Sequence, residues 1–92
     1  NQYLSPAERK AAPALFQALQ EAEKRVRSGE RDVSKIREAA LAVLHESIRV
    51  EYFEIVDPGE MQPVATVAGP VRIASAVRIG STRLIDYVLV YP

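Results

Sequence analysis

The residues that could do chemistry in this chain are few, and their spacing does not complete a reactive site. His45 is the only histidine among 92 residues and there is no cysteine, so the ligand sets typical of zinc centres cannot be assembled. His45 would also be the only imidazole base for a serine nucleophile, and no serine lies in the strand-to-helix turn that such a nucleophile occupies. The sequence predicts neither a metal centre nor a serine hydrolase, and His45 is interpreted as a partly exposed residue near a helix end.

Carboxylates and glycines offer no site by spacing alone. Glu51 and Glu54 are three residues apart in an expected strand, so strand alternation places them on opposite faces. They are interpreted as solvated charges, because an acid–base pair would have to share one face. The four glycines are too scattered to form a phosphate-binding loop, so a nucleotide is expected to be held mostly elsewhere.

One cluster is harder to dismiss, the segment Gly80-Ser81-Thr82-Arg83-Leu84-Ile85-Asp86. Arg83 and Asp86 are three residues apart on an expected strand, so they should face opposite sides and each should need another partner. Backbone or cross-strand partners are favoured over direct contact with a substrate. Arg83 nevertheless remains a candidate substrate-binding residue.

The composition indicates one small domain with no net charge. The 92 residues, 48% of them apolar, suffice for a single modest core. The 12 basic and 12 acidic residues cancel, which removes the electrostatic reason to bind nucleic acid or an anionic membrane. No apolar run approaches the ~20 residues of a membrane helix, and the lack of cysteine is compatible with a reducing compartment, so the cytoplasm is expected. The chain begins at Asn1 instead of methionine, which indicates processing or excision from a longer polypeptide.

A first amphipathic helix is predicted near the start of the chain. Ser5, Pro6 and Glu8 form a capping box with proline at the first helical position. Apolar residues at steps of three and four then continue to about Arg27. Pro13 lies inside this helix, so a kink or a restarted helix is expected there.

A second helix follows after a short connection. Gly29 is expected to end the first helix in the left-handed conformation, and Asp32 is expected to cap the second. The second helix should end near Ser47, and the two helices should form a hairpin. Neither helix is apolar all round, so each needs a partner layer.

Three strands are predicted over residues 49–56, 71–79 and 82–90. The alternation of the first is interrupted at Tyr52-Phe53, which indicates a bulge or burial on both sides. Residues 57–70 should be irregular, and Gly80-Ser81 should form a two-residue hairpin turn. The predicted fold class is α+β, a helical hairpin packed on a three-stranded antiparallel sheet in two layers.

Three separate segments of the chain resemble one known family. Asn1 to Arg9, Val50 to Asp57 and Gly80 to Asp86 together resemble the C-terminal domain of the pantothenate synthetases, the pantoate–β-alanine ligase family. The resemblance covers the whole chain, residues 1–92. It departs from the family pattern at Tyr87, where asparagine is usual, and is loose from Glu60 to Gly69.

The resemblance implies a two-domain, cytoplasmic and homodimeric ligase whose N-terminal Rossmann-like domain lies outside this chain. That domain would bind ATP, Mg²⁺ and pantoate, form a pantoyl adenylate, and let the amine of β-alanine displace AMP. In the family, a His-x-Gly-His segment and a Met-Ser-Ser-Arg loop hold the nucleotide, and the loop directly precedes the position of Asn1. Asn1 is thus a candidate at the edge of the nucleotide loop, and the domain resembles a lid over the cleft.

A different class of function stays open at this point. The chain could be a free-standing protein-interaction module whose sheet offers one face or edge to a partner. A small independent enzyme has no constellation of residues to support it.

Overall fold

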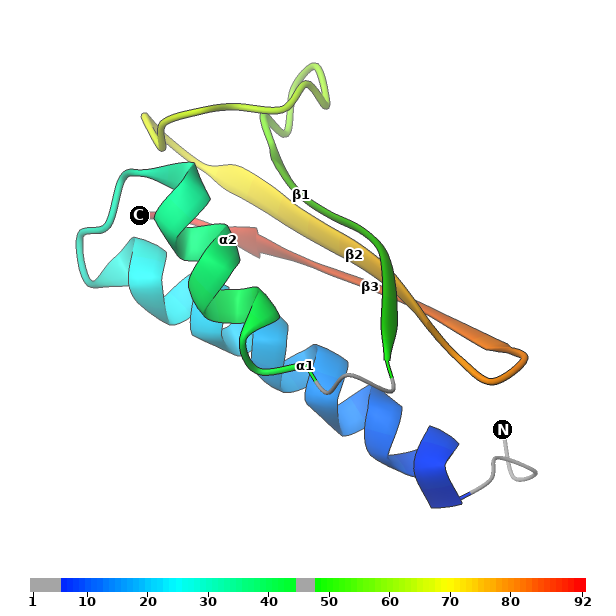
Figure 1. The fold of residues 1–92 in the computed structure, drawn as a ribbon. Coiled ribbons are helices and arrows are strands. Elements are labelled where there is room, and N and C mark those ends of the chain that lie inside the picture. Colours follow the sequence, from blue (N-terminus) through cyan, green and yellow to red (C-terminus); the bar gives the residue numbers. More distant parts are fainter. Residues whose placement is uncertain (1–5, 45–47) are drawn as a thin grey trace.

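Two helices lie on one face of a three-stranded sheet (Figure 1). The computed structural model describes residues 6–44 and 48–92. In chain order the elements are α1 (Pro6–Arg27), α2 (Val33–Leu41), β1 (Arg49–Val56), β2 (Val71–Ile79) and β3 (Thr82–Val90). The predicted α+β class, a helical hairpin on an antiparallel sheet, is confirmed. Neither helix in these ranges is long and apolar enough to span a membrane.

Helix α1 forms because small and aliphatic residues recur on one of its faces. That face is buried and consists of Ala14, Leu15, Ala18, Leu19, Ala22 and Val26. The helix runs through Pro13 without interruption, so the expected restart is wrong. Pro13 is exposed, and the Arg9 carbonyl that lacks its partner there can be hydrated from the same side. Packing of the opposite face then outweighs the local cost.

A Schellman motif ends α1. Gly29 has a φ of 111°, and its N–H donates to the Val26 carbonyl at 3.2 Å. The N–H of Glu30 donates to the Arg25 carbonyl at 3.0 Å, which completes the pair of bonds that defines the motif. The prediction that Gly29 ends the helix with a positive φ is confirmed.

Helix α2 begins as predicted but ends early. The Asp32 carboxylate accepts from the Ser34 N–H at 2.9 Å and caps the helix. The last helical residue is Leu41, so the expected end near Ser47 is wrong. The N–H groups of residues 43–44 donate to carbonyls three residues earlier, at 3.1 Å each, so tighter turns replace the α-helical ladder.

Strand β2 is the centre of the sheet, with β1 and β3 antiparallel on either side. Gly80, with a φ of 58°, and Ser81 form the predicted two-residue turn between β2 and β3. The face of β2 toward the helices is buried and consists of Val71, Ile73, Ser75, Val77 and Ile79. We call the other side the open face; it carries Arg72, Ala74, Ala76 and Arg78 of β2 and their cross-strand partners.

The core between the two layers is apolar and its buried hydroxyl is satisfied. Phe53 and Ile73 are fully buried beneath the helices, each stabilising the fold by about 1.5–3 kcal/mol. Ser75 is buried among them, and its hydroxyl donates to the Tyr52 carbonyl at 2.8 Å. A second cluster joins α1 to the hairpin end of the sheet and consists of Ala14, Leu15, Ile48, Val77 and Ile79.

The connection over residues 57–70 is irregular, as predicted, and covers the outer edge of β1. The Asp57 carboxylate accepts from the N–H groups of Gly59 and Glu60 at 3.2 and 3.1 Å and closes a turn. The chain then returns to β1, where the Val64 N–H donates to the Ile55 carbonyl at 3.1 Å. This edge of the sheet is therefore paired within the domain.

The Schellman motif yields a stability prediction with a matched control. Gly29→Ala should lower the free energy of unfolding by about 1–2 kcal/mol, because the φ of 111° is unfavourable for a residue with a Cβ although space is free around it. Gly69→Ala, also in open space but without a positive φ, should change it by less than about 1 kcal/mol. Urea unfolding curves measure both values. Equal effects of the two substitutions would contradict this account of the helix end.

Candidate functional site

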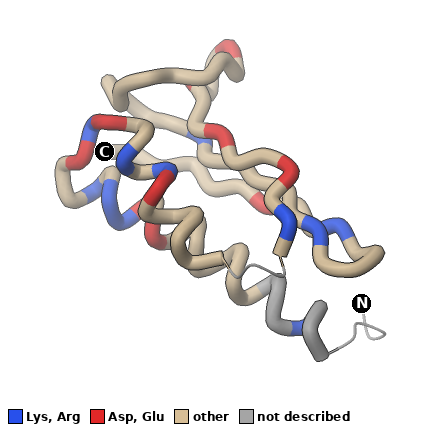
Figure 2. The backbone as a smooth tube through the Cα atoms, in the orientation of Figure 1, with Lys and Arg blue, Asp and Glu red and all other residues tan. Residues whose placement is uncertain are grey.

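Arg83, the candidate from the sequence, lies on β3 at the hairpin end of the open face. It pairs across the sheet with Arg78, and Arg78 pairs on its other side with Arg49. Three arginines thus form a row across all three strands, and Figure 2 shows basic positions at the start of β1 and on both sides of the hairpin. Like charges directly opposite each other destabilise a sheet, so this row needs a counter-charge.

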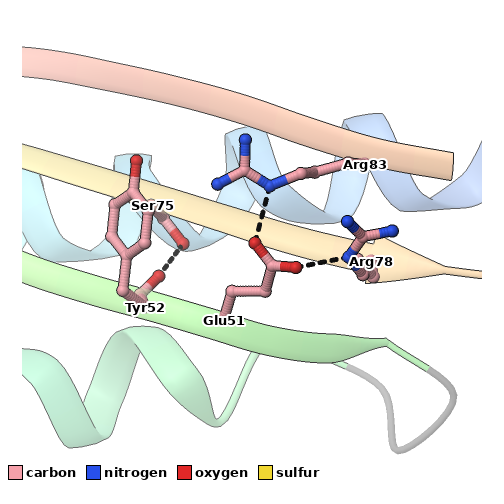
Figure 3. A network of polar contacts seen from close by, with 5 residues as sticks. All are labelled: Glu51, Tyr52, Ser75, Arg78 and Arg83. Carbon is pink, nitrogen blue, oxygen red and sulfur yellow. Dashed lines mark hydrogen bonds and ion pairs between the residues drawn. The ribbon is translucent and has the colours of Figure 1, made fainter.

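Glu51 supplies that counter-charge. Its Oε1 accepts from Nε of Arg83 at 2.6 Å, and its Oε2 accepts from Nε of Arg78. Figure 3 shows the carboxylate between the two guanidinium groups, whose terminal nitrogens point away from it. One carboxylate therefore bridges the two outer strands of the sheet over the central one. The prediction that Arg83 has a cross-strand partner is confirmed.

A β-bulge brings Glu51 to this position. The register of β1 against β2 shifts between Val50 and Tyr52, so two residues of β1 oppose one of β2. The bulge explains the broken alternation in the sequence, and it turns Glu51 to the open face beside Tyr52. Glu54 lies on the open face too, opposite Ala74, so the expectation that Glu51 and Glu54 face opposite sides is wrong.

The ion pairs shift the titration of the groups that form them. The hydrogen bonds from Arg83 and Arg78 lower the pKa of Glu51 from its usual value near 4.5, against a smaller opposing effect of desolvation. The bond that Arg83 donates to Glu51 raises the pKa of the Arg83 guanidinium. With two arginines and one glutamate, the network has a formal net positive charge.

Asp86 lies on the other side of β3, as strand alternation predicts, and does not pair with Arg83. Its side chain is half-buried between β3 and α1. Its Oδ1 accepts from the Tyr87 N–H at 2.8 Å. The sequence prediction of a backbone partner for this carboxylate is confirmed.

Tyr87 and Arg72 form a second polar feature of the open face, at the end away from the hairpin. The guanidinium carbon of Arg72 lies 5.3 Å from the centre of the Tyr87 ring, a cation–π contact. Nε of Arg72 is buried and has no hydrogen-bond partner in the described part of the chain. The ring of Tyr87, the residue at which the chain departs from the family pattern, thus covers a charged side chain.

The contacts of these residues lie within the domain: two ion pairs, a cation–π contact and a hydrogen bond to the backbone. No group of three His, Cys, Asp or Glu residues in ranges 6–44 and 48–92 could hold a metal ion. Asn1 and His45 lie outside the described residues, so their predicted roles stay predictions. Sequence reasoning missed Glu51 and Arg78 as partners in one network with Arg83. The sequence signal that could have revealed Glu51 was the interrupted alternation of apolar and polar residues beside it, at Tyr52-Phe53.

Comparisons with known proteins identify what this chain is similar to. It matches the family model described as pantoate-beta-alanine ligase over residues 1–89. A pantothenate synthetase from Fervidobacterium nodosum is 43% identical over 91 residues, which cover 98% of this chain and 32% of that protein. A bifunctional pantoate ligase/cytidylate kinase from Gloeobacter violaceus is 45% identical over 91 residues, covering 97% of this chain and 18% of that protein.

The fold comparison agrees with the sequence comparison. A crystal structure of pantothenate synthetase from Thermus thermophilus superimposes with a TM-score of 0.89 at 34% identity. It covers all of this chain and 34% of that one. The chain thus spans about a third of the length of the pantothenate synthetases it matches.

The lowered pKa of Glu51 predicts how the stability of the fold depends on pH. Above pH 4.5 the carboxylate is charged and stabilises the arginine row, and this contribution is lost as the pH falls through the lower pKa of the folded state. Glu51→Gln should therefore lower the melting temperature at pH 7, and the difference from the unaltered chain should shrink steadily below pH 4.5.

Glu54→Gln is the matched control, because Glu54 shares the strand and the face but makes no ion pair within the described residues. Its melting temperature should follow that of the unaltered chain at every pH. Thermal unfolding followed by circular dichroism from about pH 2 to about pH 7, a range that includes the usual pKa of 4.5, measures both melting temperatures. A deficit of Glu51→Gln that persists undiminished at the acid limit would contradict the ion-pair account.

Proposed function

Because the chain belongs to the pantoate–β-alanine ligase family, we propose that it is the C-terminal domain of an ATP-dependent ligase that joins pantoate to β-alanine. The observation that carries the proposal is the match over residues 1–89 to proteins about three times as long. The proposal divides the work of the enzyme between two parts, of which this chain is one.

The chemistry belongs, in this proposal, to the part of the ligase outside these 92 residues. An AMP-forming ligase needs groups that hold ATP and its Mg²⁺, and the described residues supply no acidic cluster for the metal. The turns at Gly29, Gly59 and Gly80 are separate structural turns and do not form a phosphate-binding loop. The nucleotide, the metal and both acyl-transfer substrates are therefore assigned to an N-terminal Rossmann-like domain.

The role proposed for this chain is that of a lid. Pantoate activated as an adenylate is prone to hydrolysis, so the ligase gains from a cover that excludes water until β-alanine attacks. A lid must move as one body, and the two-layer fold supports this. The core joins α1 to the sheet from Ala14 to Val26, and Glu51 links the strands on the open face.

The same proposal includes the location and the oligomeric state of the whole ligase. We place it in the cytoplasm and expect a homodimer whose main contact lies in the N-terminal part. Asn1 would stand at the edge of the nucleotide loop, and Arg83 would shape the lid through Glu51.

Deleting the lid from the full-length ligase tests the proposal. Removal of residues 1–92 should lower the rate of pantothenate formation by more than about 100-fold, because the reacting groups are no longer held and shielded. The ratio of AMP released to pantothenate formed should rise above one, since water then competes with β-alanine. Coupled assays of AMP and of pantothenate measure both quantities. A truncated ligase with an unchanged rate and ratio would refute the lid.

The 92-residue chain alone should show no ligase activity and no tight binding of the nucleotide. Titration calorimetry with ATP and Mg²⁺ should give a dissociation constant weaker than about 1 mM, because the residues that hold them are assigned to the other domain. The full-length ligase, titrated under the same conditions, is the control. Micromolar binding by the isolated chain would count against the division of labour.

A further inference from the structure

The exposed large apolar side chains gather around one strand. Five of them lie on or beside β3, with exposed fractions of 54% for Phe16, 58% for Ile85, 63% for Tyr87, 38% for Leu89 and 61% for Tyr91. Met61, in the connection between β1 and β2, is the other such residue in the described ranges. We call Phe16, Ile85, Tyr87, Leu89 and Tyr91 the β3 surface. Exposed apolar side chains are ordinary when scattered, but several gathered at one element mark a contact site. Ile85, Tyr87 and Leu89 share the open face of β3, and Phe16 of α1 lies near Tyr87.

The two edges of the sheet differ in how their backbone groups are satisfied. On β1, the Phe53 carbonyl accepts from Nε of Arg37 at 2.9 Å, and the Ile55 carbonyl accepts from the Val64 N–H. On the outer side of β3, no strand or connection pairs with the edge within the described ranges. The domain therefore covers one edge with its own chain and leaves the other available.

The backbone groups at the available edge belong to the same residues as the exposed side chains. The Tyr87 N–H is bonded to the adjacent Asp86 side chain and not to β2, so Tyr87 points its backbone outward. Backbone direction alternates along an antiparallel strand, which places the N–H and carbonyl groups of Ile85 and Leu89 outward as well. A partner at this edge would meet hydrogen-bonding groups and apolar side chains together.

A pocket of about 110 Å³ lies beside this edge, between α1 and β3. Phe16, Leu19 and Val88 give it apolar walls, and Asp86 and Glu23 place carboxylates at it. It could take one apolar side chain with a hydrogen-bond donor beside it. The outer surface of α2, by contrast, exposes the polar residues Ser34, Lys35, Arg37 and Glu38.

We propose that the β3 surface is where the remaining two thirds of the ligase polypeptide dock on this domain. This inference rests on the proposed function. The relatives supply the occupant, because this chain covers only 31–34% of most of them and the rest of the polypeptide must meet the lid somewhere. Tyr87, which lies between Ile85 and Leu89 on this strand, is of a residue type enriched at protein interfaces. The polar outer surface of α2 is the side that faces water.

Photo-crosslinking in the full-length ligase tests the docking surface. Tyr87→benzoylphenylalanine should, on irradiation, link to a peptide outside these 92 residues in the same subunit. Lys35→benzoylphenylalanine, exposed on α2, is the matched control and should give no such link. Mass spectrometry identifies the peptides, and denaturing gels distinguish links within a subunit from links between subunits. Links from position 35 only, links between two subunits, or no link from position 87 would each overturn the proposal.

A pair of charge substitutions gives an independent readout. Ile85→Glu should lower kcat of the full-length ligase by about tenfold or more with an unchanged melting temperature, because the closed lid is then less populated. Lys35→Glu should leave kcat within about twofold. Equal kcat values for the two variants would contradict docking through β3.

The lid and its docking surface can fail separately. If removing residues 1–92 abolishes pantothenate formation while positions 85 and 87 prove irrelevant, the lid stands and this surface is wrong. If the truncated ligase keeps its full rate, the proposed function itself fails first.

Discussion

A sheet of three strands in a domain of this size can bury one face but not both, and the arrangement of the whole chain depends on that constraint. The helical hairpin covers the face that carries Phe53, Ile73 and Val77, and no further element within residues 6–44 and 48–92 covers the other. The open face must therefore either be compatible with water or be covered by something else. Its two ends solve this problem differently. The hairpin end is ionic, and the other end combines exposed apolar and aromatic side chains with Arg72 beneath the ring of Tyr87.

The ionic end depends on a single irregularity of the backbone. Without the bulge between Val50 and Tyr52, strict alternation would direct Glu51 toward the helices, where a carboxylate would be desolvated and unpaired. The arginine row would then have no counter-charge between β2 and β3. With the bulge, one carboxylate holds Arg78 and Arg83 at the end of the sheet where the hairpin turns. This one-residue change in register thus keeps the Glu51 carboxylate out of the core and also places it where it can hold the two arginines of the hairpin.

The fold could be predicted from the sequence because single residues specify where its helices and strands begin and end. Gly29, Asp32 and Gly80 each identify a helix end, a cap or a turn through the φ or the hydrogen bond that the residue type favours. The errors arise where distant packing decides. Pro13 is tolerated because the buried face of α1 holds the helix together, and α2 ends before Ser47 although its apolar spacing continues.

The site was less predictable than the fold for a related reason. Strand alternation alone separates Arg83 from Asp86 and predicts that each has another partner, which the structure confirms. It cannot supply the identity of the partner, since Glu51 lies 32 residues from Arg83 and reaches it across β2. The faces of Glu51 and Glu54 were wrong for the same reason, because a bulge changes the parity of every residue beyond it. A break in alternation next to a charged residue is thus the sign to examine first in such strands.

In the proposed lid role, this domain has to be stiff within itself and selective in what it touches. Stiffness comes from the buried layer and from ion pairs that cross all three strands, neither of which needs a partner. Selectivity in that role requires the reverse, a surface left uncovered for a partner, and β3 has this property in a strand edge that no other strand pairs with in the described ranges and in its exposed side chains. Exposing such an edge carries a risk of unwanted pairing. The half-buried Asp86 reduces that risk, because its carboxylate accepts from the outward N–H of Tyr87 and leaves that donor less available to a foreign strand. Asp86, which the sequence analysis considered together with Arg83, thereby protects the edge. A partner that donates a hydrogen bond to the Asp86 carboxylate would free the Tyr87 N–H for pairing.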